Sequence, residues 1–119
     1  RQMCIRDRVM AVELFVSSKG GTESLMVNEI APRVHNSGHW TEAACHVSQF
    51  EQHIRAVAGW PLGDTRRHSD CVMENLLGDE IFACPGLAAL PGAVVHDYGK
   101  ATSRDGRKMG HVTRLILRK

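Results

Sequence analysis

The residues best suited to chemistry lie at positions 28–40, which read Asn-Glu-Ile-Ala-Pro-Arg-Val-His-Asn-Ser-Gly-His-Trp. This run contains a carboxylate, a guanidinium, two imidazoles and two amides, and its apolar residues follow no fixed period. Such side chains bind anions, metal ions and protons, whereas a segment that only packs in a core repeats its apolar residues. We therefore predict that positions 28–40 form one wall of an active site, on a loop that follows a strand.

Two apolar runs, residues 9–16 and 25–30, must position this loop. Gly20 and Gly21 lie between the runs, and glycine pairs are typical of the turns that join antiparallel strands. The sequence therefore predicts a β-hairpin that leads directly into the polar run.

A five-residue hairpin loop over positions 19–23 would pair Glu13 with Glu29, whereas a one-residue slip would bury Glu29 opposite Val12. The first register also gives an apolar opposite face, made of Val12, Leu14, Val16, Met26 and Ile30. Two opposed carboxylates repel each other, and a divalent cation such as Mg²⁺ would remove that penalty. The alternative is that both glutamates are ordinary solvent-exposed residues.

The remaining elements are a helix and several strands. Ser48 and Glu51 have the spacing of a capping box, which predicts a helix from Gln49 that Gly59 ends. A polar linker over residues 63–69 follows the helix. Beyond the linker the sequence predicts a β-rich unit with strands at residues 71–77, 93–98 and 109–117. The predicted fold class is α+β.

The second unit also carries a cluster of positive charge, in which Lys100, Arg104, Arg107 and Lys108 accompany Gly106. Glycine lets backbone amides approach a ligand, so a phosphate would suit this loop. The alternative is a solvated basic hairpin tip. Zinc is disfavoured, because a compact set of three ligands is absent from the sequence.

Composition limits the remaining function classes. The 119 residues carry a net charge of +2, which by itself does not indicate a nucleic-acid partner, and no apolar run is long enough to span a membrane. The four cysteines are dispersed without a C-x-x-C pair, which favours reduced thiols in the cytoplasm.

The chain begins with Arg1, and residues 1–8 have no apolar period. We expect a fragment with a non-native opening segment.

Eight short motifs follow one another along the chain: VELF (12–15), VNEIAPR (27–33), HNSGHWT (35–41), SQFEQH (48–53), PLG (61–63), NLLG (75–78), HDYGK (96–100) and GRKMGHVT (106–113). In this order they resemble the C-terminal part of the N5-carboxyaminoimidazole ribonucleotide synthetase family of ATP-grasp ligases. The resemblance covers nearly everything after Arg8 and departs at Val34, where the family usually has proline. It implies that residues 9–62 are the C-terminal part of an ATP-grasp domain, a hairpin plus a helix. Residues 63–119 would then be a small, mostly β C-terminal domain.

The resemblance also implies roles for individual residues. Glu13 and Glu29 would hold Mg²⁺ or Mn²⁺, while Asn28 and Glu29 would contact ATP. Arg33, His35 and Asn36 would be catalytic, with Arg33 handling bicarbonate or carboxyphosphate. The phosphate of the nucleotide substrate would be bound by Lys100 and Arg107.

The implied reaction is the ATP-dependent carboxylation of aminoimidazole ribonucleotide with bicarbonate, in a complete enzyme that is a homodimer. The chain lacks the regions that would bind adenine and ribose, so we expect it to be inactive alone and to expose apolar surface. Two alternatives are a related ATP-grasp ligase, such as the formate-dependent glycinamide ribonucleotide transformylase, and a non-catalytic metal- or nucleotide-binding module.

Overall fold

The computed structural model describes residues 8–116, which form two compact units. Within this range the first unit contains residues 8–39 and 47–65, and the second contains residues 40–46 and 66–116. Both helices and strands are present, so the predicted α+β class is confirmed. Of the predicted non-native opening segment, residues 1–8, only Arg8 lies within the described part of the chain.

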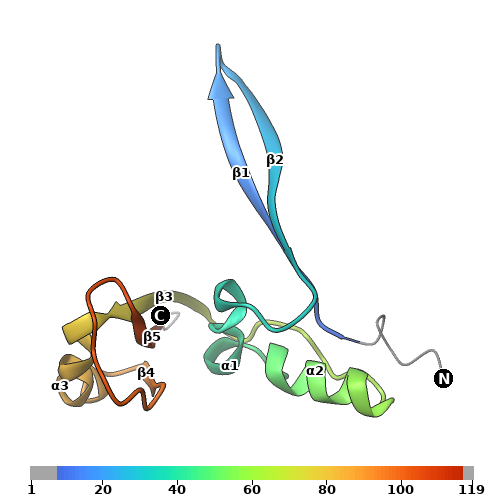
Figure 1. The fold of residues 1–119 in the computed structure, drawn as a ribbon. Coiled ribbons are helices and arrows are strands. Elements are labelled where there is room, and N and C mark those ends of the chain that lie inside the picture. The colour runs from blue at the N-terminus through green and yellow to red at the C-terminus, as the bar shows by residue number, and fades with distance from the viewer. Residues whose placement is uncertain (1–7, 117–119) are drawn as a thin grey trace. The chain divides into compact units, whose positions relative to one another are not determined.

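The first unit begins with a long twisted hairpin of two antiparallel strands, β1 (Ala11–Lys19) and β2 (Thr22–Ala31) (Figure 1). Gly20 and Gly21 form the whole turn, because Lys19 pairs with Thr22. Their φ angles are 62° and 80°, a left-handed conformation that two-residue hairpin turns require and that glycine adopts without strain. The predicted five-residue loop is therefore wrong, and both strands are longer than predicted.

The predicted pairing of Glu13 with Glu29 is nevertheless confirmed. A two-residue turn alone would place Glu13 opposite Asn28, but the register shifts between Glu13 and Leu14, and Leu14 pairs with Val27. Asn28 is thus the additional residue of a β-bulge, a feature that bends a strand and redirects a side chain.

The bulge also changes the membership of the predicted apolar face. Met26 pairs with Phe15 on the face that carries Glu13, so its predicted position beside Leu14 is wrong. Most large apolar side chains of the hairpin are exposed in the described structure, which agrees with the predicted apolar surface: Val12, Leu14, Phe15, Val16, Leu25, Met26, Val27 and Ile30.

The loop after β2 contains the short 3₁₀ helix η1 (Asn36–Gly38) and precedes helix α2 (Gln49–Ala58). Ser48 caps α2 by accepting a hydrogen bond from the Glu51 backbone N–H at 3.2 Å, as the capping-box pattern predicts. Gly59 ends the helix in a left-handed conformation. No helix in the described part of the chain is long and apolar enough to cross a membrane.

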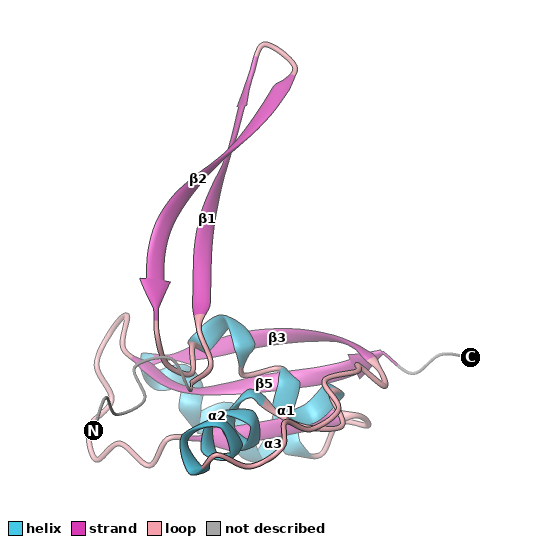
Figure 2. Ribbon diagram, turned by 90° about the vertical axis from the view of Figure 1, so that its right-hand side faces the viewer, coloured by secondary structure: helices cyan, strands magenta, loops and turns pink. Residues whose placement is uncertain are grey.

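The second unit contains the elements α1 (Thr41–Ala44), β3 (Asp70–Leu77), η2 (Gly78–Ala83), α3 (Cys84–Ala88), β4 (Ala93–Asp97) and β5 (Lys108–Ile116). Its strands form a three-stranded antiparallel sheet in the order β3-β5-β4, in which β3 and β5 run side by side (Figure 2). The short helical segments η2 and α3 connect β3 to β4, and the core contains Leu76, Ile81, Met109 and Val112.

Residues 40–46 belong to the second unit although they precede helix α2 in the sequence. Cys45 forms an isolated antiparallel bridge with Arg67, flanked by hydrogen bonds from His46 N to Arg66 O at 3.1 Å and from His68 N to Ala44 O at 2.8 Å. The compact units therefore divide the chain differently from the predicted domains, residues 9–62 and 63–119, which stay a prediction.

Candidate active site

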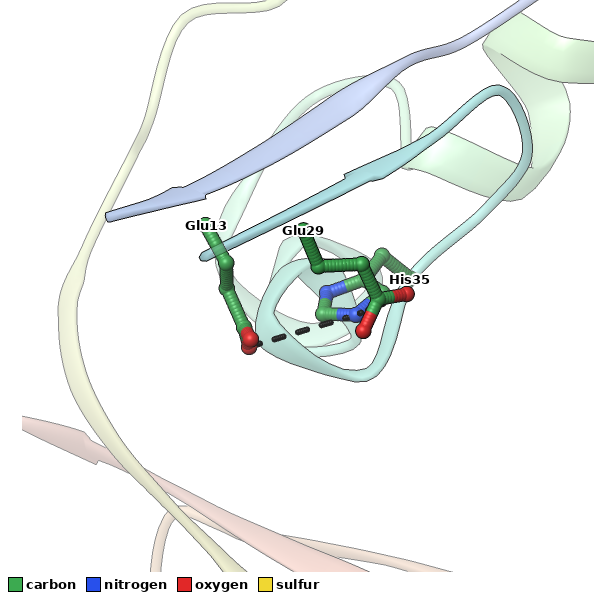
Figure 3. Close-up of side chains that lie close together, drawn as sticks. All are labelled: Glu13, Glu29 and His35. Atoms are coloured by element: carbon green, nitrogen blue, oxygen red, sulfur yellow. Dashed lines mark ion pairs between the residues drawn. The ribbon is translucent and has the colours of Figure 1, made fainter. Parts of the chain in front are cut away.

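Three side chains of the first unit converge beside the β-bulge (Figure 3). The Nε2 atom of His35 lies 3.9 Å from Oε1 of Glu13 and 3.9 Å from Oε1 of Glu29. One potential ligand atom from each residue lies within 4.8 Å of the others. Two carboxylates and an imidazole at this separation can share one divalent cation.

The donor set fits the expected metal ion. Carboxylate oxygens are the ligands that Mg²⁺ prefers, and a nitrogen donor such as His35 also suits Mn²⁺. The two glutamates are about half exposed, so a phosphate ligand could reach an ion held between them. Glu13 and Glu29 are therefore brought together as the sequence predicted, and His35 lies within reach of the same ion.

Asn28 and Arg33 each contact one of the two glutamates. The Asn28 Nδ2 atom donates to Oε2 of Glu13 at 3.1 Å, which fixes one carboxylate while its Oε1 atom still faces His35. Arg33 lies 3.6 Å from Oε1 of Glu29 and donates to the Val34 carbonyl at 2.9 Å. Because the Arg33 side chain is largely exposed, its guanidinium can also bind an incoming anion.

Ser37 orients the His35 ring. The Nδ1 atom of His35 lies 2.8 Å from the Ser37 hydroxyl, and in the tautomer with the proton on Nε2 it also accepts from the Ser37 backbone N–H at 3.4 Å. A metal held at Nε2 would require the other tautomer, in which Nδ1 carries the proton and donates it to the Ser37 hydroxyl in place of the backbone contact. The His35 side chain is only 11% exposed, so packing restricts it as well. Asn36 begins η1 on the same loop, and its predicted catalytic role stays a prediction.

Gln49 is the residue that the sequence did not identify. It is buried at the start of helix α2, and its side-chain amide is bonded to the backbone of His35. In the sequence it follows the N-cap Ser48 like an ordinary helical residue, so no pattern distinguished it. Only the folded structure, in which the loop of His35 lies against the first residue of α2, reveals this contact.

The predicted phosphate-binding residues lie in the second unit, on the loop before β5. The Lys100 ammonium donates to the Lys108 carbonyl and lies 5.5 Å from the centre of the Tyr98 ring. Arg107 donates to the Thr102 carbonyl at 3.0 Å. A pocket of about 190 Å³ opens beside this loop and is lined by Ile81, Phe82, Asp97, Gly99, Lys100, Ala101, Ser103 and Met109. Lys100 therefore lines a pocket, while Arg107 is hydrogen-bonded to the backbone of the same loop.

Two segments of the chain match known domain families. Residues 8–50 match the ATP-grasp domain, and residues 71–116 match the phosphoribosylaminoimidazole carboxylase C-terminal domain. The two matches cover the hairpin with its polar loop and the three-stranded sheet, respectively.

Curated relatives and solved structures agree with these matches. The chain is 64% identical to the N5-carboxyaminoimidazole ribonucleotide synthase of Brucella melitensis, over 90% of the chain and 29% of that protein. It is 51% identical to the Bacillus subtilis synthase, over 87% of the chain and 27% of that protein. The chain therefore spans less than a third of the length of these relatives.

A solved N5-carboxyaminoimidazole ribonucleotide synthetase in complex with ADP has a TM-score of 0.81 and 44% identity, over 92% of this chain and 29% of that one. The Aspergillus clavatus enzyme in complex with ADP and 5-aminoimidazole ribonucleotide has a TM-score of 0.79 and 34% identity, over 90% of this chain and 30% of that one. The two domain matches, the 64% identity and the shared fold agree, and this chain belongs to the N5-carboxyaminoimidazole ribonucleotide synthase family of ATP-grasp proteins.

Proposed function

We propose that this chain supplies the metal-binding hairpin and the ribonucleotide-phosphate loop of an ATP-dependent ligase. The ligase would carboxylate 5-aminoimidazole ribonucleotide with bicarbonate to give N5-carboxyaminoimidazole ribonucleotide. The observation that carries the proposal is the convergence of Glu13, Glu29 and His35 in a chain 64% identical to a synthase of this name.

In this proposal Glu13 and Glu29 hold Mg²⁺ or Mn²⁺, and Asn28 keeps the Glu13 carboxylate oriented through its 3.1 Å hydrogen bond. A divalent cation at these residues would supply positive charge that offsets the charge developing on the phosphates of ATP during phosphoryl transfer. Asn28 and Glu29 would thereby also contact ATP.

Arg33 would bind bicarbonate beside this metal site. A bicarbonate oxygen attacks the γ-phosphorus of ATP, the bond to the β-phosphate oxygen breaks, and ADP and carboxyphosphate form. The exocyclic amine of the ribonucleotide then attacks the carboxyl carbon of carboxyphosphate, and inorganic phosphate leaves with the amine proton. Alternatively, carboxyphosphate first releases CO₂ and inorganic phosphate, and the amine attacks the CO₂ and passes its proton to the phosphate. The Arg33 guanidinium would stabilise the anions in both steps. His35 and Asn36, on the same loop, are the other two catalytic residues of the proposal.

Lys100 and Arg107 would bind the 5′-phosphate of the ribonucleotide. Lys100 supplies a point charge at the pocket of the second unit, and Arg107 supplies a planar donor group on the same loop.

The complete enzyme would be a homodimer in the cytoplasm. The free thiols of Cys45, Cys71 and Cys84 support a reducing compartment.

A chimaera tests this function directly. The 119-residue chain would replace the matching segment of the Brucella melitensis relative, and ADP formation would be measured with bicarbonate and aminoimidazole ribonucleotide. We expect activity that requires both substrates and is lost in the Glu29→Gln chimaera. A folded chimaera that forms no ADP, or that prefers formate and glycinamide ribonucleotide, would contradict the proposal. The isolated chain is expected to form no ADP.

A further inference from the structure

Gln49 is a buried polar residue with both ends of its amide in use. It is 8% exposed, and its Oε1 atom accepts from the His35 backbone N–H at 3.0 Å. Its Nε2 atom donates to the His35 carbonyl at 2.8 Å and lies 2.7 Å from Nδ1 of His39. The side chain thus makes the paired hydrogen bonds that a neighbouring strand would make with His35.

This network fixes the orientation of the amide. A flipped amide would set its NH₂ group against the His35 N–H and its oxygen against the His35 carbonyl, which would replace two hydrogen bonds by two repulsions. With the observed orientation, the two Nε2 protons point to the His35 carbonyl and to the His39 ring. Gln49 is therefore held in one conformation, at the first residue of a helix that Ser48 caps.

The geometry points to Gln49 as a positioning residue for the metal site. It fixes the His35 backbone, Ser37 fixes the His35 ring, and the ring Nε2 then lies 3.9 Å from both glutamates. Helix α2 thereby anchors the loop that carries His35. This inference deepens the proposed function, because it rests on metal binding by Glu13 and Glu29.

The same helix offers a matched control. Gln52 is also 8% exposed, and its amide makes the same pair of bonds to another backbone, donating to the Gly63 carbonyl at 2.7 Å and accepting from Gly63 N at 2.9 Å. Residue type, helix, burial and the paired backbone bonds are alike, so Gln52→Met should cost a similar amount of stability. The two residues differ in the backbone they bond, Gly63 for Gln52 and His35 for Gln49, and in the additional contact of Gln49 with His39.

The test compares the 119-residue chain with its Gln49→Met and Gln52→Met variants. In the metal-free chain, NMR would record nuclear Overhauser contacts from the His35 ring to the side chains of Glu13 and Glu29. The dissociation constant for Mn²⁺ would then be measured by electron paramagnetic resonance. We expect Gln49→Met to lose the ring contacts and to weaken Mn²⁺ binding by about tenfold or more, as loss of an outer partner of a metal ligand typically does. Gln52→Met should change neither.

Unchanged ring contacts in Gln49→Met, or equal losses in both variants, would overturn the inference. If Gln49→Met does not fold, Gln49→Glu serves in its place. The carboxylate still accepts from His35 N but cannot donate to the His35 carbonyl, so the same ring contacts should weaken. If the unaltered chain binds no Mn²⁺, the proposed metal site fails, while the metal-free ring contacts still decide the role of Gln49.

Discussion

Glu13 lies directly opposite Glu29 because the second strand of the hairpin carries one additional residue, Asn28, at this point. The two-residue turn alone would pair Glu13 with Asn28. Because the bulge inserts Asn28 without advancing the pairing, Glu29 takes the opposed position and the Asn28 amide bonds to Glu13. One irregularity thus gathers two carboxylates and an amide at the end of the strand that leads to His35.

Removing one carboxylate should abolish most of the metal affinity. We expect Glu29→Gln to weaken Mn²⁺ binding to the chain by well over tenfold, because a neutral amide oxygen replaces a charged ligand. Glu23→Gln is the control, since Glu23 is exposed on the same hairpin opposite Ser18. Isothermal titration calorimetry would measure the Mn²⁺ affinity of both variants. Equal affinities in the two variants would show that Glu29 is not a metal ligand.

Gly38→Ala should disturb the loop that carries His35. A Cβ atom at position 38 would lie 2.5 Å from Oε1 of Gln49, whose amide cannot move without breaking its bonds to His35. The expected cost is about 1–3 kcal/mol. Amide hydrogen exchange at His35 should accelerate by roughly five- to hundredfold through local opening of this bond.

Gly86→Ala is the matched control for that substitution, because position 86 lies in helix α3 with open space around it. Alanine is favoured over glycine in a helix by roughly 0.5–1 kcal/mol, so this variant should be neutral or stabilised. Unaltered exchange at His35 in Gly38→Ala would show that the loop does not depend on the Gln49 contact.

Loss of either predicted phosphate ligand should weaken binding of ribose 5-phosphate, used here as a minimal probe. Each charge-assisted hydrogen bond contributes about 1.5–3 kcal/mol, so Lys100→Met and Arg107→Met should each weaken binding by roughly tenfold or more. Lys19→Met removes the same charge from the end of β1 and should have no effect. Chemical-shift titration measures all three variants, and equal affinities would favour a solvated basic loop.

The cysteine thiols should react slowly with iodoacetamide at pH 8.5. Burial raises the pKa of the Cys45, Cys71 and Cys84 thiols above that of a free thiol, and the neighbouring Cys71 raises the pKa of Cys45 further. Less reactive thiolate is therefore present in the folded chain than in urea. Peptide mass spectrometry over pH 7–11 should show a higher alkylation midpoint in the folded state for each of these cysteines.

The same shifts have a consequence for stability. A raised pKa favours the protonated thiol in the folded state, so its contribution is complete below about pH 9 and is lost as the pH rises through the folded value. The free energy of unfolding should therefore fall as the pH rises above about 9. Serine in place of Cys45 and Cys71 should reduce that fall, and an unchanged profile would contradict the assigned burial effect.

Local patterns were sufficient for much of this protein. The Ser48–Glu51 capping box predicted the start of helix α2, and Gly59 predicted its end. The three predicted strands of the second unit agree with the observed strands to within about one residue. The run from Asn28 to Trp40 identified the site itself, because its polar residues are adjacent in the chain and need no tertiary contact to be recognised.

Turn chemistry and register show where local reasoning ended. The sequence predicted the correct partners, Glu13 and Glu29, with the wrong loop, because a five-residue turn and a two-residue turn with a bulge leave the same residues opposed. Only the pairing of the complete strands distinguishes the two, and only the bulge turns Asn28 toward Glu13.

The sequence by itself determined the family, the opposed pair of carboxylates and the polar loop beside them, since these depend on residue types at short spacing. The tertiary structure alone decided that His35 reaches both carboxylates and that Gln49 holds it there. Gln49 is fourteen residues from His35 and belongs to an ordinary helical pattern. Its role arises only when the loop folds back onto the first turn of α2, because a buried amide must then find partners and the His35 backbone supplies them.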